Sequence, residues 1–254
     1  MTDGRAGKGG IAFRALLPNA VTALALCFGL TAIRFAAGGE WEKALAAIIF
    51  AGILDAMDGR IARLLRADSR FGAELDSLSD VIAFGVAPAI VLFLWSLTDA
   101  PQFGWIAALA LALACALRLA RFNAQIDADW QPHKSAGFLT GVPAPAGAGL
   151  AFIPVYLWLL TDMELFRAWY VTMPWVLFVA MLTISNIATY SWSSLRIRRS
   201  SRLFAIAGIG LLGTALVTNP WSTLLAIAGL YLLLLPFSIA SYARVKRRRA
   251  GAGA

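Results

Sequence analysis

The chain has 254 residues, of which 60% are hydrophobic and only 14% are charged. Soluble domains carry about 25% charged residues, so this composition excludes an ordinary soluble domain and indicates a polytopic membrane protein. The formal charge of +8 at pH 7 would suit nucleic acid, but the Lys and Arg residues come in clusters between apolar runs, which is a signal of membrane topology. We therefore expect no nucleic-acid partner, and basic segments that face anionic membrane lipids.

Eight apolar stretches follow one another along the chain. A helix of about 20 apolar residues spans the hydrocarbon core of a bilayer. We therefore predict an all-α fold, a polytopic integral membrane helical bundle of about eight transmembrane helices. Their expected ranges are 15–37, 43–64, 77–98, 103–122, 138–160, 170–191, 203–218 and 221–243.

The dividers between these stretches alternate between basic and nearly uncharged sequences. If both termini face the cytosol, 19 of the 22 Lys and Arg residues lie on the cytosolic side, and only Arg34, Lys43 and Arg167 lie outside. The positive-inside rule then favours eight helices. We expect a multi-pass protein of the cell inner (cytoplasmic) membrane, with the acidic segment described next at its cytosolic side.

Four acidic residues lie in or beside the second and third apolar stretches. Asp55 and Asp58 are three residues apart, and Asp76 and Asp80 are four apart, so each pair occupies one face of its helix. Four charged side chains at mid-bilayer would together cost on the order of 10 kcal/mol, so they must face a polar cavity. A short turn, capped by Asp68 or Ser69, would make the two helices antiparallel neighbours and bring the acidic faces together.

Carboxylate oxygens without Cys or His suit hard cations such as Mg²⁺ or Mn²⁺. The alternative is a set of buried ion pairs that hold the helices together. Its cations would be arginines of the same segment, Arg60, Arg63, Arg66 and Arg70. This alternative leaves the small residues interleaved on the acidic faces unexplained.

The segment reads D-x2-D-G-x2-A-R-x8-G-x3-D-x3-D, and it resembles the signature of the CDP-alcohol phosphotransferase family. The eight fixed positions of this signature are filled by Asp55, Asp58, Gly59, Ala62, Arg63, Gly72, Asp76 and Asp80. The resemblance implies exchange of CMP on a CDP-linked lipid for an incoming alcohol, with two divalent ions as cofactors. It implies Asp55, Asp58 and Asp76 as principal metal ligands and Asp80 as general base and further ligand. The CDP site would be lined by Asp58, Gly59, Ala62, Arg63 and Gly72.

A second group of polar residues follows the fourth apolar stretch. Arg118 and Arg121 lie three apart, with Asn123 just beyond. The planar fork of arginine suits carboxylates and phosphates, whereas the alternative is membrane anchoring by side chains that reach the interface. The next stretch, GFLTGVPAPAGAG, contains Pro143 and Pro145, so we expect a broken or kinked helix that lines a cavity.

These segments are similar to the membrane-embedded phosphatidylserine synthases within the family. The matching segments are LPNAVT (Pro18, Asn19, Thr22), ELDSLSDVIAFGVAPA, ALRLARFN, the FxxGxPxP pattern from Phe138 to Pro145, and ISN at 184–186. The resemblance implies CDP-diacylglycerol and L-serine as substrates, phosphatidylserine and CMP as products, and a homodimer. We expect Arg118, Arg121 and Asn123 to hold the serine carboxylate or a lipid phosphate.

The expected organisation is a flexible basic cytosolic tail at 1–14, a six-helix family core at 15–191, two additional helices at 192–243 and a basic cytosolic tail at 244–254. Glycerol 3-phosphate or an inositol phosphate remains an alternative acceptor, and a small membrane transporter is the alternative from another class.

Cys27 and Cys115 both lie within apolar runs, where we expect buried free thiols. His133 lies in a polar loop, where we expect a surface position.

Overall fold

The structure is a computed structural model that describes residues 13–65, 69–100, 102–126, 138–185, 187–190 and 202–252. Several sequence-based expectations lie outside these residues: the tail at 1–12, Arg66, Asp68, His133, Lys134, Asn186 and the basic cluster at 196–199. The chain divides into two compact units, residues 1–83 and 84–254. Each unit is described by itself below.

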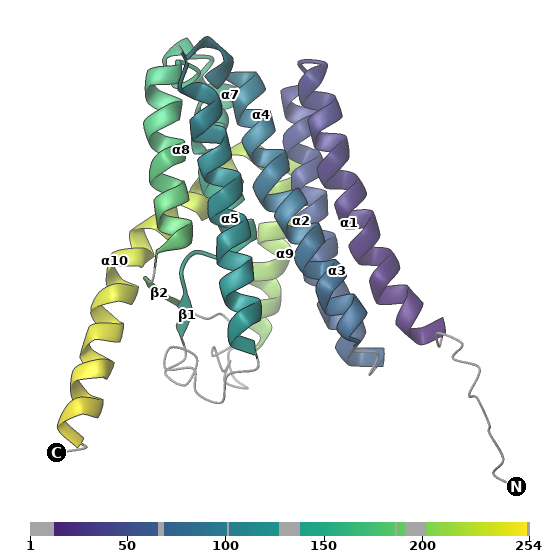
Figure 1. The fold of residues 1–254 in the computed structure, drawn as a ribbon, viewed down its shortest axis with the longest axis vertical. Helices are drawn as coiled ribbons and strands as arrows, with labels where there is room; N and C mark the ends of the chain where they lie inside the picture. Colours follow the sequence, from purple (N-terminus) through teal and green to yellow (C-terminus); the bar gives the residue numbers. More distant parts are fainter. Residues whose placement is uncertain are drawn as a thin grey trace, which may run out of the picture. The chain divides into compact units, whose positions relative to one another are not determined.

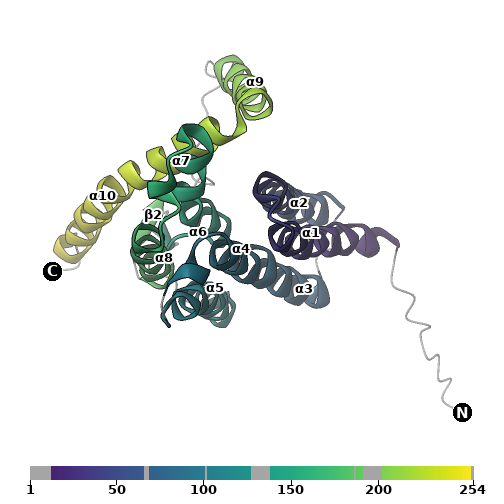
Figure 2. The same ribbon diagram turned by 90° about the horizontal axis from the view of Figure 1, so that it is seen from above.

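The described residues of the first unit form three α-helices, α1 (Phe13–Ala37), α2 (Trp41–Leu65) and α3 (Arg70–Asp80) (Figure 1). A π-helical segment, Val81–Val86, continues α3. Helix α1 packs against both α2 and α3 and lies between them (Figure 2). Both acid-bearing helices thus pack on α1, and their acidic faces meet across one cavity. This arrangement leaves space between α2 and α3 for a cavity.

Small side chains allow α1 and α2 to approach closely. Ala25, Ala32 and Ala36 on α1 are at most 2% exposed, and they recur at the spacing of one helix face. On α2, Ala44 and Ala51 are fully buried. Membrane helices associate mainly by close van der Waals packing, which small residues favour. The acid-bearing helix α2 is thereby held along its length by α1.

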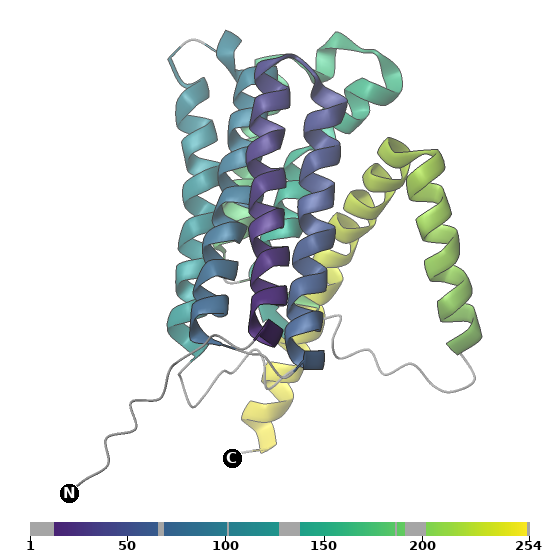
Figure 3. The same ribbon diagram turned by 90° about the vertical axis from the view of Figure 1, so that its right-hand side faces the viewer.

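The second unit contains the remaining helices. They are α4 (Ala87–Trp95), α5 (Gly104–Ile126), α6 (Ala144–Ala151), α7 (Ile153–Thr161), α8 (Trp169–Ile184), α9 (Arg202–Thr218) and α10 (Pro220–Ala252), with 3₁₀ turns at Leu97–Asp99 and Glu164–Phe166. Helix α5 packs against α4 and α8, and α10 packs against α7. Helices α9 and α10 meet at Asn219 and diverge from there (Figure 3).

Eight helical segments of the described chain match the eight predicted ones, and the all-α membrane bundle is confirmed as the fold class. Among the residues that the structure describes, five segments are long and apolar enough to cross a membrane: Leu16–Ala37, Arg70–Trp95, Gly104–Ala124, Ala144–Thr161 and Pro220–Ser241. Trp169–Ile184 and Ile206–Thr218 are shorter apolar helices. Helix α2 has 25 residues, a spanning length, although it carries acidic and basic residues. The chain is a multi-pass helical membrane protein.

Two parts of the predicted helices are short strands instead. Strand β1 (Phe138–Thr140) pairs antiparallel with β2 (Ala188–Tyr190), with Leu139 opposite Thr189. The predicted helices at 138–160 and 170–191 are therefore wrong at these ends. Pro143 disfavours helical backbone at the residue before it, and α6 begins only after Pro143. Helix α8 ends at Ile184, and the backbone of its C-cap Ser185 is extended, with a ψ of 160°.

The expected break in the fifth apolar stretch is confirmed. Phe152 separates α6 from α7, and Pro154 occupies the first turn of α7.

The two cysteines differ from each other in exposure. Cys115 is buried as expected, but Cys27 is exposed on α1, so the expectation of two buried thiols is wrong for Cys27. In a membrane helix the lipid-facing and the buried faces are both apolar, so hydrophobicity alone does not predict which residues are buried.

Gly141 joins the strand pair to the end of α8. Its φ is 73°, and its N–H donates to the Ile187 carbonyl at 2.8 Å. A Cβ here would lie 2.9 Å from the Thr183 oxygen and 3.0 Å from the Ser185 oxygen. Both the left-handed backbone and the close approach therefore require glycine.

We expect Gly141→Ala to lower the free energy of unfolding by about 1–3 kcal/mol, the usual cost of a strained backbone position. Thermal unfolding of the purified protein in detergent measures this change. Gly149→Ala is the matched control, because a Cβ at Gly149 would meet nothing within 4 Å. Equal unfolding temperatures for the two variants would contradict the assignment.

Candidate active site

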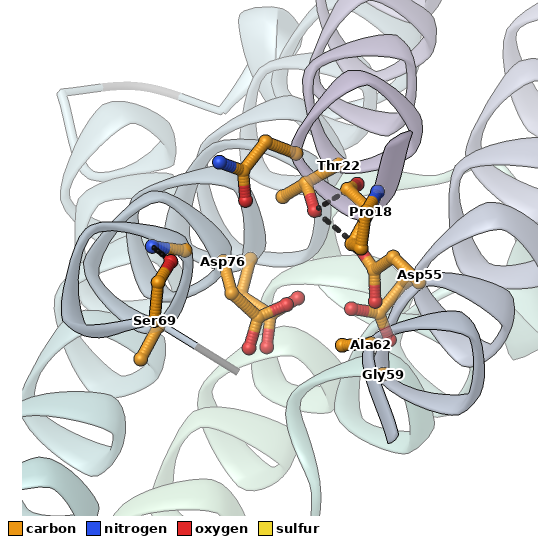
Figure 4. A pocket seen from close by; sticks show the side chains of 12 residues that line it. Pro18, Thr22, Asp55, Gly59, Ala62, Ser69 and Asp76 are labelled. Atoms are coloured by element: carbon orange, nitrogen blue, oxygen red, sulfur yellow. Dashed lines mark hydrogen bonds between the residues drawn. The ribbon is translucent and has the colours of Figure 1, made fainter. Parts of the chain in front are cut away.

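A cavity of about 420 Å³ opens within the first unit, between α2 and α3 and beside α1 (Figure 4). Its lining is unusually polar for a membrane bundle. Four acidic side chains line it together with hydroxyl and amide groups and small residues. The lining residues are Pro18, Asn19, Thr22, Asp55, Asp58, Gly59, Ala62, Ser69, Gly72, Ala73, Asp76 and Asp80. The predicted polar cavity is thus present, and all four predicted acids face it.

Three of the four carboxylates form a tight group. Asp55 on α2 and Asp76 and Asp80 on α3 each offer an oxygen, and these three oxygens lie within 4.8 Å of one another. All three residues are half-buried, and Figure 4 shows Asp55 and Asp76 facing the same space. The spacing of four residues on α3 places both of its acids on this face. We call Asp55, Asp76 and Asp80 the carboxylate cluster.

The cluster fits a hard divalent cation. Its donors are all carboxylate oxygens, the ligands preferred by Mg²⁺ and Mn²⁺, and the described part of the cavity lining contains no Cys or His. Three negative charges so close together repel one another unless a cation offsets them. The chemistry of the donor set therefore agrees with a metal site at the position that the sequence predicts.

Asp58 occupies a different position from the other three acids. It is 4% exposed, and its Oδ2 accepts a hydrogen bond of 2.6 Å from the hydroxyl of Thr22 on α1. Asp58 lines the same cavity but is not part of the carboxylate cluster. The spacing of three residues on α2 places Asp55 and Asp58 on one face, yet the two carboxylates have different partners.

Helix α1 supplies a wall of the cavity that the sequence analysis did not assign to the site. Pro18, Asn19 and Thr22 contribute to the lining. Thr22 is 4% exposed, and its carbonyl oxygen accepts from the Ser79 hydroxyl at 3.2 Å. The signal was present in the sequence, because Asn19 and Thr22 are polar residues three apart in an apolar stretch. The resemblance of the LPNAVT segment to the family predicts no role for these residues in the site.

The start of α3 matches the expected capping. The Ser69 hydroxyl accepts from the Gly72 N–H at 3.0 Å, so Ser69 is the N-cap. A Cβ at Gly72 would lie 2.8 Å from the Asn19 Oδ1 and 3.1 Å from the Ser69 oxygen. The absence of a side chain at Gly72 therefore lets α1 and α3 come together beside the cavity.

The remaining motif positions divide between the cavity and its surroundings. Gly59 and Ala62 line the cavity, and a Cβ at Gly59 would meet nothing within 4 Å. Arg63 is exposed and is not among the lining residues; its Nε donates to the Gly59 carbonyl at 2.9 Å. Arg60 and Arg70 are also exposed. Buried ion pairs with these three arginines therefore do not explain the acids.

The second predicted group lies on α5, in the second unit. Arg121 is half-buried, and its Nη2 donates to the Ile184 carbonyl at 2.9 Å. This bond satisfies a carbonyl at the C-terminal end of α8, where a cation is favourable. Arg118 and Asn123 are half-buried on the same helix. Arg121 thus has a structural contact in addition to the substrate role expected of it.

Comparison with known proteins agrees with the geometry. A family model described as CDP-alcohol phosphatidyltransferase matches residues 15–182, and one described as CDP-alcohol phosphatidyltransferase 2 matches residues 201–236. The first match contains the whole cavity lining.

Relatives named CDP-diacylglycerol–serine O-phosphatidyltransferase align with most of the chain. The protein of Mycobacterium leprae is 38% identical over 228 residues, which cover 88% of this chain and 74% of the relative. That of Helicobacter pylori is 30% identical over 223 residues, covering 86% and 88%. That of Methanocaldococcus jannaschii is 34% identical over 167 residues, covering 66% and 70%. The chain belongs to the CDP-alcohol phosphatidyltransferase family.

Proposed function

We propose that the chain transfers the phosphatidyl group of CDP-diacylglycerol to the hydroxyl of L-serine, giving phosphatidylserine and CMP. The relatives that align over most of the chain carry the name of this activity. The observation that carries the assignment to a site is the carboxylate cluster on a cavity of about 420 Å³. Such a cavity within a membrane bundle offers a polar place for a nucleotide diphosphate beside lipid.

The transfer needs one bond to form and one to break. The serine hydroxyl oxygen attacks the phosphorus of the phosphatidyl group, the bond from that phosphorus to the CMP oxygen breaks, and CMP leaves with the bonding electrons. The hydroxyl proton passes to a base. A hydroxyl is a poor nucleophile until a positioned group takes its proton, and we assign this role to Asp80, which lines the cavity as part of the carboxylate cluster.

The cofactor of the proposal is a divalent metal, Mg²⁺ or Mn²⁺, as two ions held by Asp55, Asp58, Asp76 and Asp80. Bound there, the metal would stabilise the negative charge on the phosphate oxygens and on departing CMP. The chain's own residues bring four carboxylates from two helices to one cavity. The hydrogen bond from Thr22 to Asp58 holds one of these carboxylates in place.

The CDP part of the lipid is proposed to lie against Asp58, Gly59, Ala62 and Gly72, which line the cavity, with Arg63 offsetting phosphate charge. Arg63 is exposed, so it would have to turn toward the phosphates. The small residues leave room for the nucleotide. Arg118, Arg121 and Asn123 on α5 are proposed to hold the serine carboxylate or a lipid phosphate.

Gly59→Ala tests this use of the cavity. The added methyl group meets no protein atom within 4 Å, so the unfolding temperature should stay the same or rise, since alanine favours helix by about 1 kcal/mol over glycine. If CDP occupies this space, KM for CDP-diacylglycerol should rise about tenfold or more, the cost of about 1.4 kcal/mol of lost binding. KM for serine should change less.

The control for Gly59→Ala is Gly208→Ala on α9, where a Cβ also meets nothing within 4 Å. Steady-state CMP release with each substrate varied in turn measures both KM values. An unchanged KM for CDP-diacylglycerol in Gly59→Ala would contradict the placement of CDP against α2.

The proposal extends to topology and assembly. The protein would lie in the cytoplasmic membrane with both termini and the cavity facing the cytosol, where nucleotide-activated lipid head groups and serine are available. Residues 15–191 would form the catalytic core, 192–243 two additional helices, and two copies would form a homodimer. The topology is tested by labelling cysteines introduced at the two termini of the protein in intact cells. The homodimer is tested by the mass of the detergent-solubilised protein.

The experiment that tests the proposed function is CMP release by the purified protein in detergent with CDP-diacylglycerol and Mn²⁺ or Mg²⁺. Each acceptor is supplied separately: L-serine, glycerol 3-phosphate and an inositol phosphate. We expect release with L-serine and loss of release on chelation. Release only with one of the other acceptors would keep the family and overturn the substrate. Bound metal without release for any acceptor would favour the transporter alternative.

A further inference from the structure

Thr22 on α1 hydrogen-bonds to both acid-bearing helices. Its hydroxyl donates to the Asp58 carboxylate on α2 at 2.6 Å. Its carbonyl oxygen accepts from the Ser79 hydroxyl on α3 at 3.2 Å. Ser79 lies between Asp76 and Asp80 in the sequence. One residue of α1 therefore connects the two helices whose acids face the cavity.

The residues joined by these hydrogen bonds are buried, so the loss of a bond would be costly. Thr22 and Asp58 are each 4% exposed and Ser79 is 3% exposed, so water does not replace a lost partner freely. The Thr22 hydroxyl has one proton, and the Pro18 carbonyl lies 3.1 Å away as an alternative acceptor. The shorter distance and the charge of the carboxylate favour donation to Asp58. A buried carboxylate without a donor would be costly.

We infer that Thr22 is a positioning residue, which fixes the Asp58 carboxylate and sets the separation of the acid-bearing helices α2 and α3 across the cavity. The inference rests on the proposed function, since the cavity is taken as the metal and CDP site. Helices α2 and α3 each pack on α1, so the contacts of Thr22 help to place their acids relative to one another. Thr22 does not itself join the carboxylate cluster.

Two substitutions distinguish the effect of the Thr22 hydroxyl from the effect of its side-chain shape. Thr22→Val keeps the branched shape and removes the hydrogen-bond donor, whereas Thr22→Ser keeps the donor and removes a methyl group. The control is Thr31→Val on the same helix, because the exposed Thr31 hydroxyl bonds only locally, to the Cys27 carbonyl at 2.7 Å. Unfolding temperatures in detergent show whether each protein is folded.

Removing a partner that orients a metal ligand costs about 10–100-fold in metal affinity or activity. We expect Thr22→Val to lose about that much in Mn²⁺ affinity, measured by electron paramagnetic resonance of free Mn²⁺, and in kcat/KM. Thr22→Ser and Thr31→Val should stay within about threefold of wild type, given that surface or conservative changes cost little. The rescue by serine is a result that a purely packing role would not give.

Mn²⁺ affinity is measured without lipid or alcohol, so this test is separate from that of the proposed reaction. Wild-type protein that binds Mn²⁺ but releases no CMP with serine would overturn the proposed function, and the valine–serine comparison would still decide the role of Thr22. Equal Mn²⁺ affinity in Thr22→Val and wild type would overturn the inference. So would a serine variant as weak as the valine variant, or wild-type protein that binds no Mn²⁺.

If Thr22→Val is not recovered as folded protein, Ser79→Ala takes its place. This variant removes the hydrogen bond that ties Thr22 to α3 and leaves the Thr22 hydroxyl unchanged. We expect weaker Mn²⁺ binding, because the acids of α3 lose an anchor to α1. Unchanged Mn²⁺ affinity in Ser79→Ala would overturn the role of Thr22 in setting the helix separation.

Discussion

Asp80→Asn is expected to lower kcat for CMP release by about 10²–10⁴-fold, the usual contribution of a positioned general base. Asparagine keeps the size of the side chain and one carbonyl oxygen, but it cannot accept the serine proton. Binding of CDP-diacylglycerol should persist, because the cavity wall formed by α1 and α2 is unchanged. KM for the CDP-lipid should therefore change far less than kcat.

Steady-state kinetics with each substrate varied measures the effect of Asp80→Asn. The matched control is Asp99→Asn, which makes the same chemical change at an exposed residue outside the cavity lining. Near-normal turnover of the purified Asp80→Asn protein would show that another group takes the proton. An equal fall in lipid binding would instead show that Asp80 acts as a metal ligand and not as the base.

Asp76→Asn is expected to abolish metal binding at the cluster while leaving the metal-free protein at least as stable. Loss of a residue that merely supports a ligand costs about 10–100-fold, so loss of a ligand carboxylate should lower Mn²⁺ affinity by more than 100-fold. Removal of one of three carboxylates within 4.8 Å of one another also relieves like-charge repulsion. The unfolding temperature without metal should therefore stay the same or rise.

Electron paramagnetic resonance of Mn²⁺ and thermal unfolding, with and without metal, test both parts of this expectation. Glu74→Gln is the control, since Glu74 lies on the same helix but is exposed and outside the cavity. If the carboxylate cluster binds metal, added metal should raise the unfolding temperature of the wild type and of Glu74→Gln, but not that of Asp76→Asn. Normal Mn²⁺ binding by Asp76→Asn would remove Asp76 from the ligand set.

The sequence alone predicted the acidic cavity because helical spacing determines which side chains share a face. Asp76 and Asp80, four apart, both join the carboxylate cluster. Spacing does not determine the partners of each carboxylate, and Asp58 accepts from Thr22 whereas Asp55 joins the cluster. The contribution of α1 was missed because the rotation of one helix toward another depends on packing between segments distant in the chain.

Local sequence patterns predict some of the local structure but not all of it. Ser69 was expected as a cap and is one, because capping depends on neighbouring residues. The pairing of Leu139 with Thr189 was not expected, since each strand has three residues and its partner lies about fifty positions away. The exposure of Cys27 was missed because apolar character marks lipid-facing and buried faces alike.

The central claim is that the carboxylate cluster between α2 and α3 is the metal site at which CDP-lipid chemistry takes place. Its most direct test is diffraction from crystals grown with Mn²⁺ and CDP-diacylglycerol, with anomalous scattering used to locate manganese. We expect anomalous peaks bounded by Asp55, Asp76 and Asp80, with the CDP phosphates beside them. Manganese bound elsewhere, with this cavity free of both metal and nucleotide, would contradict the account.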